Sequence, residues 1–437
     1  MSQTDEIYKK LVKNSSWLFA GKSVGSIFSG VQGILIARYL GLLQFGLFSI
    51  VQAFVDVLNI FIDLRVWEAA TKYVGDHWKA GEKDKACSLI KFFYLIDVVT
   101  GILAFTVATL TAEIATKYFL KTDGAEVYIY VYAFSLLITS PNTTSQAILR
   151  VFDKFKAIAF IGSFQNFVKI VFVIIAIVLD KGIYGILVAF VLGNLIGFII
   201  NFYYVNLTLN EHGLSGWWKR KIFFQGFQFG EIFRFLFHTS FYGSLKALKD
   251  KYLGILILGY FAGKEAAGLY KLARSFLKII SKIADPLYEA IYPELVKVYE
   301  GDNISNFVSL IKRATIGMSK IIVPIGIVVF IFADQILSLV YGSEFGLATG
   351  VVRILVFAVI ISDLASFTST AFLAVGRPGI RTKIETAALV VYITLLFVLV
   401  PVLAQIGAAL SLLAFAVVLA ILNVLYFNKY VIKNGEA

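Results

Sequence analysis

The segment Gly268-Leu-Tyr-Lys-Leu-Ala-Arg-Ser-Phe-Leu-Lys-Ile-Ile-Ser-Lys-Ile-Ala-Asp-Pro286 determines how the rest of the chain is interpreted. Apolar residues fill most of its positions, and no glycine or proline interrupts its interior, so it is predicted to be a helix. It nevertheless carries Lys271, Arg274, Lys278 and Lys282, at steps of three, four and four. At about 100° per residue, these four cations fall within an arc of roughly 80°.

We call these four residues the cationic stripe. A lysine or arginine at the centre of a membrane-spanning helix costs about 2.5–3.5 kcal/mol even on the mildest scale. If the segment crosses a bilayer, the cationic stripe cannot face lipid. The cationic stripe must line a water-filled space, pair with acidic side chains or lie near a membrane surface.

The composition indicates an all-α polytopic membrane protein. The chain has 437 residues, of which 59% are hydrophobic and 16% charged, and its mean hydropathy is +0.82. A soluble protein normally carries about 25% charged residues. The net charge is +12, and the lysines and arginines are distributed between the hydrophobic segments. This distribution encodes membrane topology and does not indicate nucleic-acid binding. The single cysteine, Cys87, excludes an intramolecular disulfide framework, and the first apolar stretch is expected to be a retained signal-anchor.

Twelve spans are predicted. They cover residues 16–37, 46–71, 88–112, 127–149, 157–179, 183–205, 235–262, 266–291, 315–333, 348–375, 383–403 and 406–428. This count gives an N-terminal lobe of six helices (1–205), a cytoplasmic or interfacial linker (206–234) rich in aromatic and basic residues, and a C-terminal lobe of six helices (235–437). Most loop lysines and arginines fall on one side of the membrane, which the positive-inside rule places in the cytoplasm together with both termini.

The two halves read as repeats. Residues 39–41 and 46–48 (Tyr-Leu-Gly and Gly-Leu-Phe) match residues 261–263 and 268–270 (Phe-Ala-Gly and Gly-Leu-Tyr) at an offset of 222. Farther along, residues 144–149 match residues 368–373 at an offset of 224. Six spans per repeat predict two pseudo-symmetric lobes, related by an axis along the membrane normal, around a central cavity.

The second predicted span carries Ser49, Gln52, Asp56, Asn59 and Asp63, at steps that give one polar face on a helix. At the repeat offset this polar face corresponds to the cationic stripe. The two faces are therefore expected to point into a shared aqueous cavity with an excess of positive charge. The alternative, in which static Asp–Lys pairs fasten the lobes together, remains open.

The candidate substrate-binding cations are Lys271, Arg274, Lys278, Lys22, Lys246, Lys249, Arg65 and Arg353. For Arg65 the alternative is an ion pair with Glu68, and Lys22 and Lys282 could instead snorkel to the interface. Asp97 and Lys169 are interpreted as structural or snorkelling charges.

The carboxylates Asp56, Asp63 and Glu68 are candidates for H⁺ or Na⁺ coupling, with neutralisation of the basic wall as the alternative. The three histidines lack metal-ligand spacing, no nucleophile–base arrangement stands out, and there is no Walker-type motif. We expect no catalytic residue, no metal, no organic cofactor and no enzymatic activity.

The runs at residues 14–22 and 36–41, with residues 46–48, 268–270 and 373–377, resemble Wzx-type flippases for lipid-linked oligosaccharides, such as O-antigen repeat units. These flippases belong to the multidrug/oligosaccharidyl-lipid/polysaccharide exporter superfamily. The resemblance implies a V-shaped pair of six-helix lobes in the cell inner membrane, working by alternating access. It implies an undecaprenyl-pyrophosphate-linked glycan as substrate, and a polysaccharide polymerase or chain-length regulator as partner.

Other functions remain in view. A cation-coupled multidrug exporter of the same superfamily should favour an acidic cavity, which the cationic stripe contradicts. Lipid II-type flippases typically have fourteen spans, whereas twelve fit here. A membrane glycosyltransferase or ligase usually needs a sizeable domain or loop outside the membrane, and the longest predicted outer loop (113–126) is short.

Overall fold

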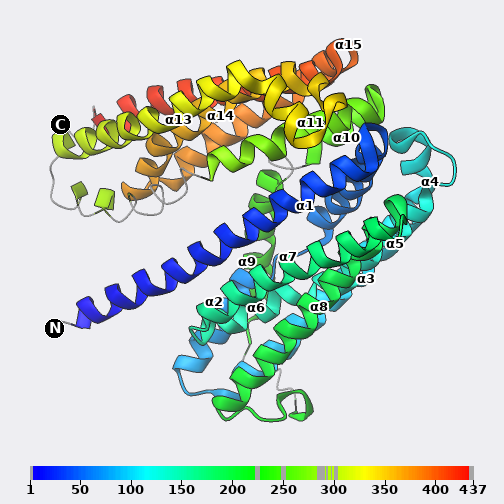
Figure 1. Cartoon of the computed structure of the whole chain (residues 1–437). Helices are drawn as coiled ribbons and strands as arrows, with labels where there is room; N and C mark the ends of the chain where they lie inside the picture. Colours follow the sequence, from blue (N-terminus) through cyan, green and yellow to red (C-terminus); the bar gives the residue numbers. More distant parts are fainter. Residues whose placement is uncertain are drawn as a thin grey trace. The chain divides into compact units, whose positions relative to one another are not determined.

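The computed structural model describes residues 3–221, 227–247, 252–282, 291, 294–296, 298, 299 and 304–432, with the backbone alone for residues 3–15, 241–247, 279, 280 and 432. All regular structure in this part of the chain is helical (Figure 1). Seven helices within these described ranges are long and apolar enough to cross a membrane. The prediction of an all-α polytopic membrane protein is confirmed.

The residues divide into two compact units. The first comprises Met1–Leu40 and Leu47–Leu253, and the second comprises Gly41–Gly46 and Gly254–Ala437. The helices of the first unit are α1 (Gln3–Ile62), α2 (Trp67–Lys79), α3 (Lys83–Leu110), α4 (Ala112–Ala115), η1 (Thr116–Leu120), α5 (Glu126–Thr139), α6 (Pro141–Val151), α7 (Phe155–Val178), α8 (Gly182–Glu211), η2 (Trp217–Lys219) and α9 (Phe229–Ala247). Those of the second are α10 (Leu253–Phe261), α11 (Gly263–Ser281), α13 (Ile304–Tyr341), η4 (Ser343–Ala348), α14 (Thr349–Ala374), α15 (Pro378–Phe427) and η5 (Asn428–Ile432).

Several predicted spans share or divide a helix. The long helices α1 and α15 each contain one residue with non-helical dihedral angles, Gly41 (φ 67°) and Ala404 (φ 47°). Each therefore holds two predicted spans on either side of a break. The fourth span is made of α5 and α6. The seventh span contains part of α9 and all of α10, and residues 248–251 between them, including Lys249, lie outside the described residues.

The second span ends earlier than predicted. A continuous helix was expected over 46–71, but α1 ends at Ile62. The Asp63 carboxylate accepts a hydrogen bond from the backbone N–H of Arg65 (3.0 Å), and Arg65 has a positive φ of 43°. A left-handed residue cannot continue an α-helix, so α2 begins separately at Trp67.

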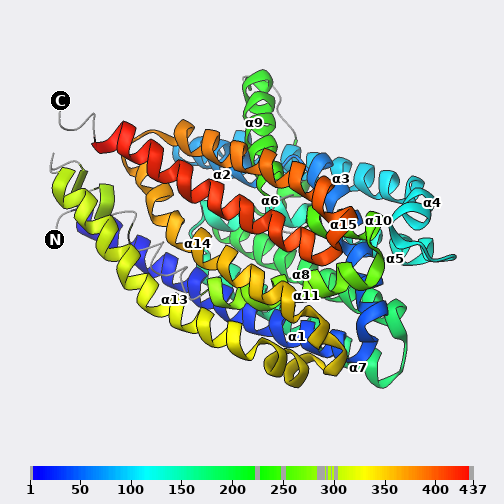
Figure 2. The same cartoon turned by 90° about the horizontal axis from the view of Figure 1, so that it is seen from above.

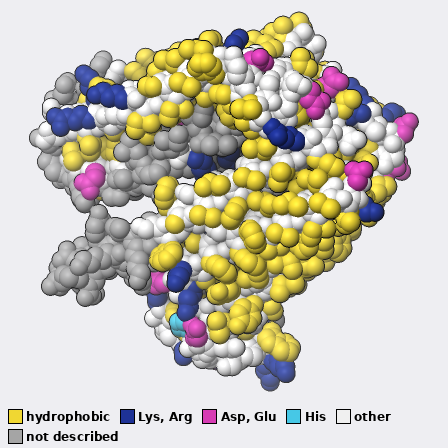
Figure 3. Space-filling model, in the orientation of Figure 1, with side chains coloured by type: hydrophobic (Ala, Val, Ile, Leu, Met, Phe, Trp, Pro, Cys, Tyr) yellow, Lys and Arg dark blue, Asp and Glu magenta, His cyan; other side chains and the backbone are white. Residues whose placement is uncertain are grey.

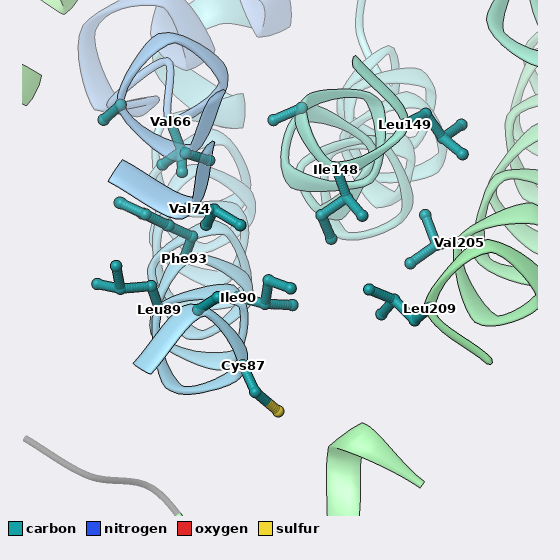
Figure 4. Packing of buried hydrophobic residues seen from close by; sticks show 14 of the residues in the cluster. Val66, Val74, Cys87, Leu89, Ile90, Phe93, Ile148, Leu149, Val205 and Leu209 are labelled. Carbon is teal, nitrogen blue, oxygen red and sulfur yellow. The ribbon is translucent and has the colours of Figure 1, made fainter. Parts of the chain in front are cut away.

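The first unit has an apolar core where α2, α3, α6 and α8 meet (Figure 4). Val74, Phe93, Ile148 and Val205 are among its fully buried members. Helix α9 packs on α2, with the rings of Tyr73 and Phe235 5.9 Å apart. It therefore lies in the first unit, although the sequence-based boundary at residue 235 assigns most of α9 to the second lobe.

The segment that follows α8 packs on this same core. The Trp217 side chain is 5% exposed, stacks on the Tyr94 ring at 5.5 Å and donates its Nε1–H to Asn206 Oδ1 at 2.8 Å. The Trp218 side chain is exposed. One of the two adjacent tryptophans is therefore a core residue, which differs from the expected surface-lying linker. The aromatic residues Phe223 and Phe224 of this linker lie outside the described residues.

In the second unit α13, α14 and α15 lie side by side, with α14 between the other two (Figures 1 and 2). Helix α11 packs on α14 and α15. Hydrophobic side chains cover broad areas of the face shown in Figure 3. The large hydrophobic residues that are exposed include Leu103, Phe134 and Ile327. Such surface is expected of helices that face lipid.

The repeat extends through more of the chain than its sequence motifs indicate. The matched glycines Gly41 and Gly263 both have positive φ, at 67° and 87°. Helices α8 and α15 also carry identical residues at the offset of 222: Gly185 matches Gly407, and Asn201 matches Asn423. Both asparagines are buried.

Candidate functional site

The cationic stripe lies on α11 in the second unit. Lys271 and Arg274 are half-buried and Lys278 is exposed, whereas Leu272 and Leu277 between them are buried. The apolar side of α11 therefore packs inside the unit, and the cations share the less buried side. The predicted helix and its polar face are present up to Ser281, where α11 ends.

Aromatic rings flank the first two cations. Lys271 Nζ lies 5.5 Å from the centroid of the Phe45 ring, and Arg274 Cζ lies 5.8 Å from that of Tyr270. These distances are within the range of a cation–π contact. Tyr270 is fully buried, and its hydroxyl lies 3.4 Å from that of Tyr392 on α15. The Phe45 and Tyr270 rings thus contact the first two cations of the cationic stripe.

Phe45 reaches α11 because two glycines allow a close crossing. A Cβ added to Gly268 would lie 3.0 Å from the Cα of Gly46 and 3.2 Å from the carbonyl oxygen of Leu42. A Cβ added to Gly46 would overlap the carbonyl of Lys264. Residues 41–46 therefore pack backbone to backbone against the start of α11, which places Phe45 beside Lys271.

The first unit contains the carboxylate candidates. Asp56 on α1 is half-buried and accepts a long hydrogen bond (3.5 Å) from the hydroxyl of Tyr132 on α5. The Tyr252 hydroxyl also hydrogen-bonds to Asp56. Gln52, one turn before Asp56 on α1, hydrogen-bonds to Tyr132. We call Asp56, Gln52, Tyr132 and Tyr252 the tyrosine–carboxylate cluster.

Lys169, interpreted from sequence as a structural or snorkelling charge, lies close to this cluster. It is on α7, half-buried, with its Nζ 5.7 Å from the Phe190 ring of α8 and within electrostatic range of Asp56. The sequence interpretation missed this association because α1 and α7 are far apart in the chain. A usable signal was the polar pair Gln165 and Lys169 on α7, four residues apart.

Asp63, Arg65 and Glu68 lie together at the end of α1. An Arg65 guanidinium nitrogen lies 3.1 Å from a Glu68 carboxylate oxygen, so the ion-pair alternative for Arg65 is present in the structure. Arg65 Nε and the other Glu68 oxygen are buried without a partner in the part of the chain that the structure describes.

The remaining candidate cations are dispersed. Arg353 is near the start of α14, where its Nε donates to the carbonyl of Phe330 on α13 (3.0 Å). Lys22 is exposed on α1. The Lys246 side chain and all of Lys249 lie outside what the structure describes.

Asp97 has a structural role. Its side chain is fully buried on α3 and caps the start of α6: it accepts from the hydroxyls of Thr143 and Thr144 (each at 2.7 Å) and from the Thr144 N–H (3.0 Å). A carboxylate at a helix N-terminus is stabilised by the unpaired N–H groups there. Among the described residues, no group of three or more His, Cys, Asp or Glu side chains could hold a metal ion.

Comparison with known proteins gives the family. A family model described as "Polysaccharide biosynthesis protein" matches residues 11–299, well over half of the chain. The chain belongs to this polysaccharide biosynthesis protein family. The match covers the whole first unit except its first ten residues, and it includes α11 with its cationic stripe.

Two curated relatives of this family member cover most of the chain. The inner membrane protein YghQ of Escherichia coli is 21% identical over 78% of this chain and 95% of its own length. A putative O-antigen transporter of Shigella flexneri is 22% identical over 92% of this chain and 94% of its own length. An inward-facing multidrug resistance MATE family transporter of the MOP superfamily has a TM-score of 0.74 at 16% identity, covering 94% of this chain and 96% of its own. That similarity shows the shared fold.

Proposed function

We propose that this protein is a flippase that moves an undecaprenyl-pyrophosphate-linked oligosaccharide from the cytoplasmic to the outer leaflet of the cell inner membrane by alternating access. The observation that carries the proposal is the cationic side of α11 in a member of the polysaccharide biosynthesis protein family. The O-antigen transporter relative supports the same substrate class.

The chemistry of such a substrate requires cations inside the membrane. Its pyrophosphate must cross about 30 Å of hydrocarbon, and burying an uncompensated charge there is prohibitive. Lysine and arginine are the usual partners of phosphate oxygens. Lys271, Arg274 and Lys278 would bind the pyrophosphate in an aqueous cavity, while the prenyl chain stays in lipid.

The tyrosine–carboxylate cluster supports coupling to an ion. Carboxylates inside membrane proteins often belong to proton or cation relays. Asp56 would exchange H⁺ or Na⁺ during the cycle, with Asp63 and Glu68 as further candidates. Both termini would be cytoplasmic, and a polysaccharide polymerase or chain-length regulator would take over the product at the outer leaflet.

The similarity to the MATE transporter structure favours a second candidate, a cation-coupled multidrug exporter. A binding site for cationic drugs should be acidic, whereas α11 presents three cations on its less buried side. The electrostatics therefore favour an anionic substrate. Neither candidate function involves enzymatic chemistry.

Transport in proteoliposomes tests the proposal. A fluorescent polyprenyl-pyrophosphate oligosaccharide would be assayed with the wild type and with Lys271→Ala, Arg274→Ala and Lys278→Ala, after insertion and folding are checked. Lys312→Ala, at an exposed position of α13, is the matched control. Loss of flipping in the α11 variants alone supports the proposal.

Normal flipping by all α11 variants would leave the flippase function intact and remove the cationic stripe from its mechanism. A folded wild type that moves no lipid-linked glycan but exports a soluble organic cation would replace the flippase with the multidrug exporter.

A further inference from the structure

Helices α7 and α8 interlock through a pair of polar side chains and a pair of glycines. Gln165 and Lys169 are one turn apart on α7, and Gly193 and Gly197 are one turn apart on α8. A Cβ added to Gly197 would lie 2.5 Å from Gln165 Cδ, and one added to Gly193 would overlap Lys169 Cγ. The two glycines therefore form the groove in which both side chains lie.

This groove fixes the aliphatic part of Lys169. Gln165 is anchored in turn by a hydrogen bond from its Nε2 to Oδ1 of the buried Asn194 (3.1 Å). The Lys169 stem is thus packed on backbone, while its ammonium lies 5.7 Å from the Phe190 ring. Phe190 is itself held by an edge contact with Phe48 at 5.6 Å. The position of the ammonium is set by packing.

The ammonium has no ion pair or hydrogen bond with any residue that the structure describes, and Lys169 as a whole residue is half-buried. An ammonium carries three N–H donors. Inside a membrane span these donors need water or an anion, because lipid offers no acceptor. Lys169 is therefore a positioned cation whose donors remain available to a ligand.

Asp56 does not occupy those donors. Its carboxylate is engaged by the hydroxyls of Tyr132 and Tyr252, and it interacts with Lys169 electrostatically, without an ion pair between these two described residues. The carboxylate thus lowers the local positive potential without closing the site. Removal of its charge should strengthen the attraction of Lys169 for an anion.

We propose that Lys169 is an anion-binding residue of the first unit, which takes one oxyanion group of the substrate, and that Asp56 limits its affinity. The inference rests on the proposed function for the identity of the transported substrate. The oxyanion is a phosphate oxygen of the lipid carrier or a carboxylate of an acidic sugar, and the two sources are separated experimentally.

Binding to the full-length protein in nanodiscs tests this. The two probes are farnesyl pyrophosphate, which has the pyrophosphate without a sugar, and methyl glucuronide, which has the carboxylate without a phosphate. Methyl glucoside is the uncharged reference. Lys156→Gln, at the start of the same helix with its ammonium over the Trp17 ring, is the matched control.

We expect Lys169→Gln to weaken one probe at least about tenfold, the ratio that corresponds to about 1.4 kcal/mol. Asp56→Asn should strengthen the same probe, whereas Lys169→Arg should retain it and Lys156→Gln should have no effect. The affected probe identifies the source of the oxyanion. Gly193→Ala, which displaces the Lys169 stem, gives a second measurement if Lys169→Gln does not fold.

Two results would overturn the proposal. One is unchanged binding of both probes by a folded Lys169→Gln variant. The other is a pattern in which Lys169→Gln and Asp56→Asn each lower the stability, the double variant restores it, and Asp56→Asn does not bind either probe more tightly. That pattern would describe a structural charge pair. Failure of the wild type to flip a lipid-linked glycan would contradict the proposed function. The probe affinities would still decide whether Lys169 binds an anion.

Discussion

Gly46 and Gly268 occupy equivalent positions in the internal repeat, and their backbones contact each other. A Cβ on Gly268 would approach the Cα of Gly46 to 3.0 Å. Each glycine follows, five residues later, a turn glycine with positive φ, Gly41 or Gly263. The motif that reveals the repeat in the sequence is therefore also the packing contact that brings Phe45 to Lys271.

Replacement of Gly46 by alanine tests this crossing. Its new methyl group would overlap the Lys264 carbonyl, which is backbone and cannot rotate away. We expect the free energy of unfolding in detergent to fall by about 1–3 kcal/mol, as for other overpacked positions. Gly33→Ala on the same helix, where a Cβ meets nothing within 4 Å, should be neutral or stabilising. Equal melting temperatures for the two variants would contradict the close crossing.

Phe45→Leu tests the support that the ring gives to Lys271. Loss of a cation–π contact of about 0.5–1 kcal/mol should weaken binding of farnesyl pyrophosphate about two- to fivefold. Phe397→Leu, at an exposed ring that contacts Phe261, is the control. Equal affinities in the two variants would show that Phe45 does not position Lys271.

Asp97→Ala tests the cap on α6. The substitution leaves the N–H and the hydroxyl of the buried Thr144 without this acceptor, whereas the Thr143 hydroxyl can still donate to the Ser140 carbonyl oxygen at 3.0 Å. We expect the free energy of unfolding to fall by about 1–3 kcal/mol, with Asp97→Asn in between because an amide oxygen can still accept. Asp123→Ala, at an exposed loop position, should change it by less than about 0.5 kcal/mol. A stable Asp97→Ala variant that loses transport would instead indicate a functional carboxylate.

Glu82, between α2 and α3, should contribute a pH dependence. Hydrogen bonds from Lys85 and from His77 hold the pKa of Glu82 below its ordinary value of 4.5. The Glu82 carboxyl therefore binds a proton less tightly in the folded protein than in the unfolded chain. Its contribution to stability is present above pH 4.5 and is lost as the pH falls through the lower pKa of the folded state. The difference in melting temperature between the wild type and Glu82→Gln should stay constant from neutral pH down to about 4.5 and shrink below it. A difference that does not shrink below pH 4.5 would contradict this role.

The sequence predicted the fold class and most spans because long apolar runs and loop charges are local signals. It misplaced the end of the second span, since the break there depends on the left-handed backbone of Arg65 and its contact with Asp63. Trp217 was expected at the membrane surface because its buried position depends on Tyr94 and Asn206, which lie elsewhere in the chain.

The helical face of the cationic stripe follows from spacing alone and was predicted correctly as far as α11 is described. The surroundings of Lys169 could not be predicted in the same way. They depend on a groove made by Gly193 and Gly197 on another helix, and on a carboxylate from α1. The spacing of residues within one segment predicts which residues share a helical face. It does not predict which residues of other helices contact that face, and a site depends on those contacts.

The membership of Gly41–Gly46 in the second unit has a consequence for how the protein can be divided. The chain enters that unit at Gly41, leaves it after Gly46 and returns at Gly254, so the two units are interleaved in sequence. A C-terminal fragment that begins at Phe227 would lack the six residues that cross the start of α11. Fragment complementation should therefore be obligatory: the C-terminal piece should reach its native, protease-resistant form only when the N-terminal piece is synthesised in the same cell.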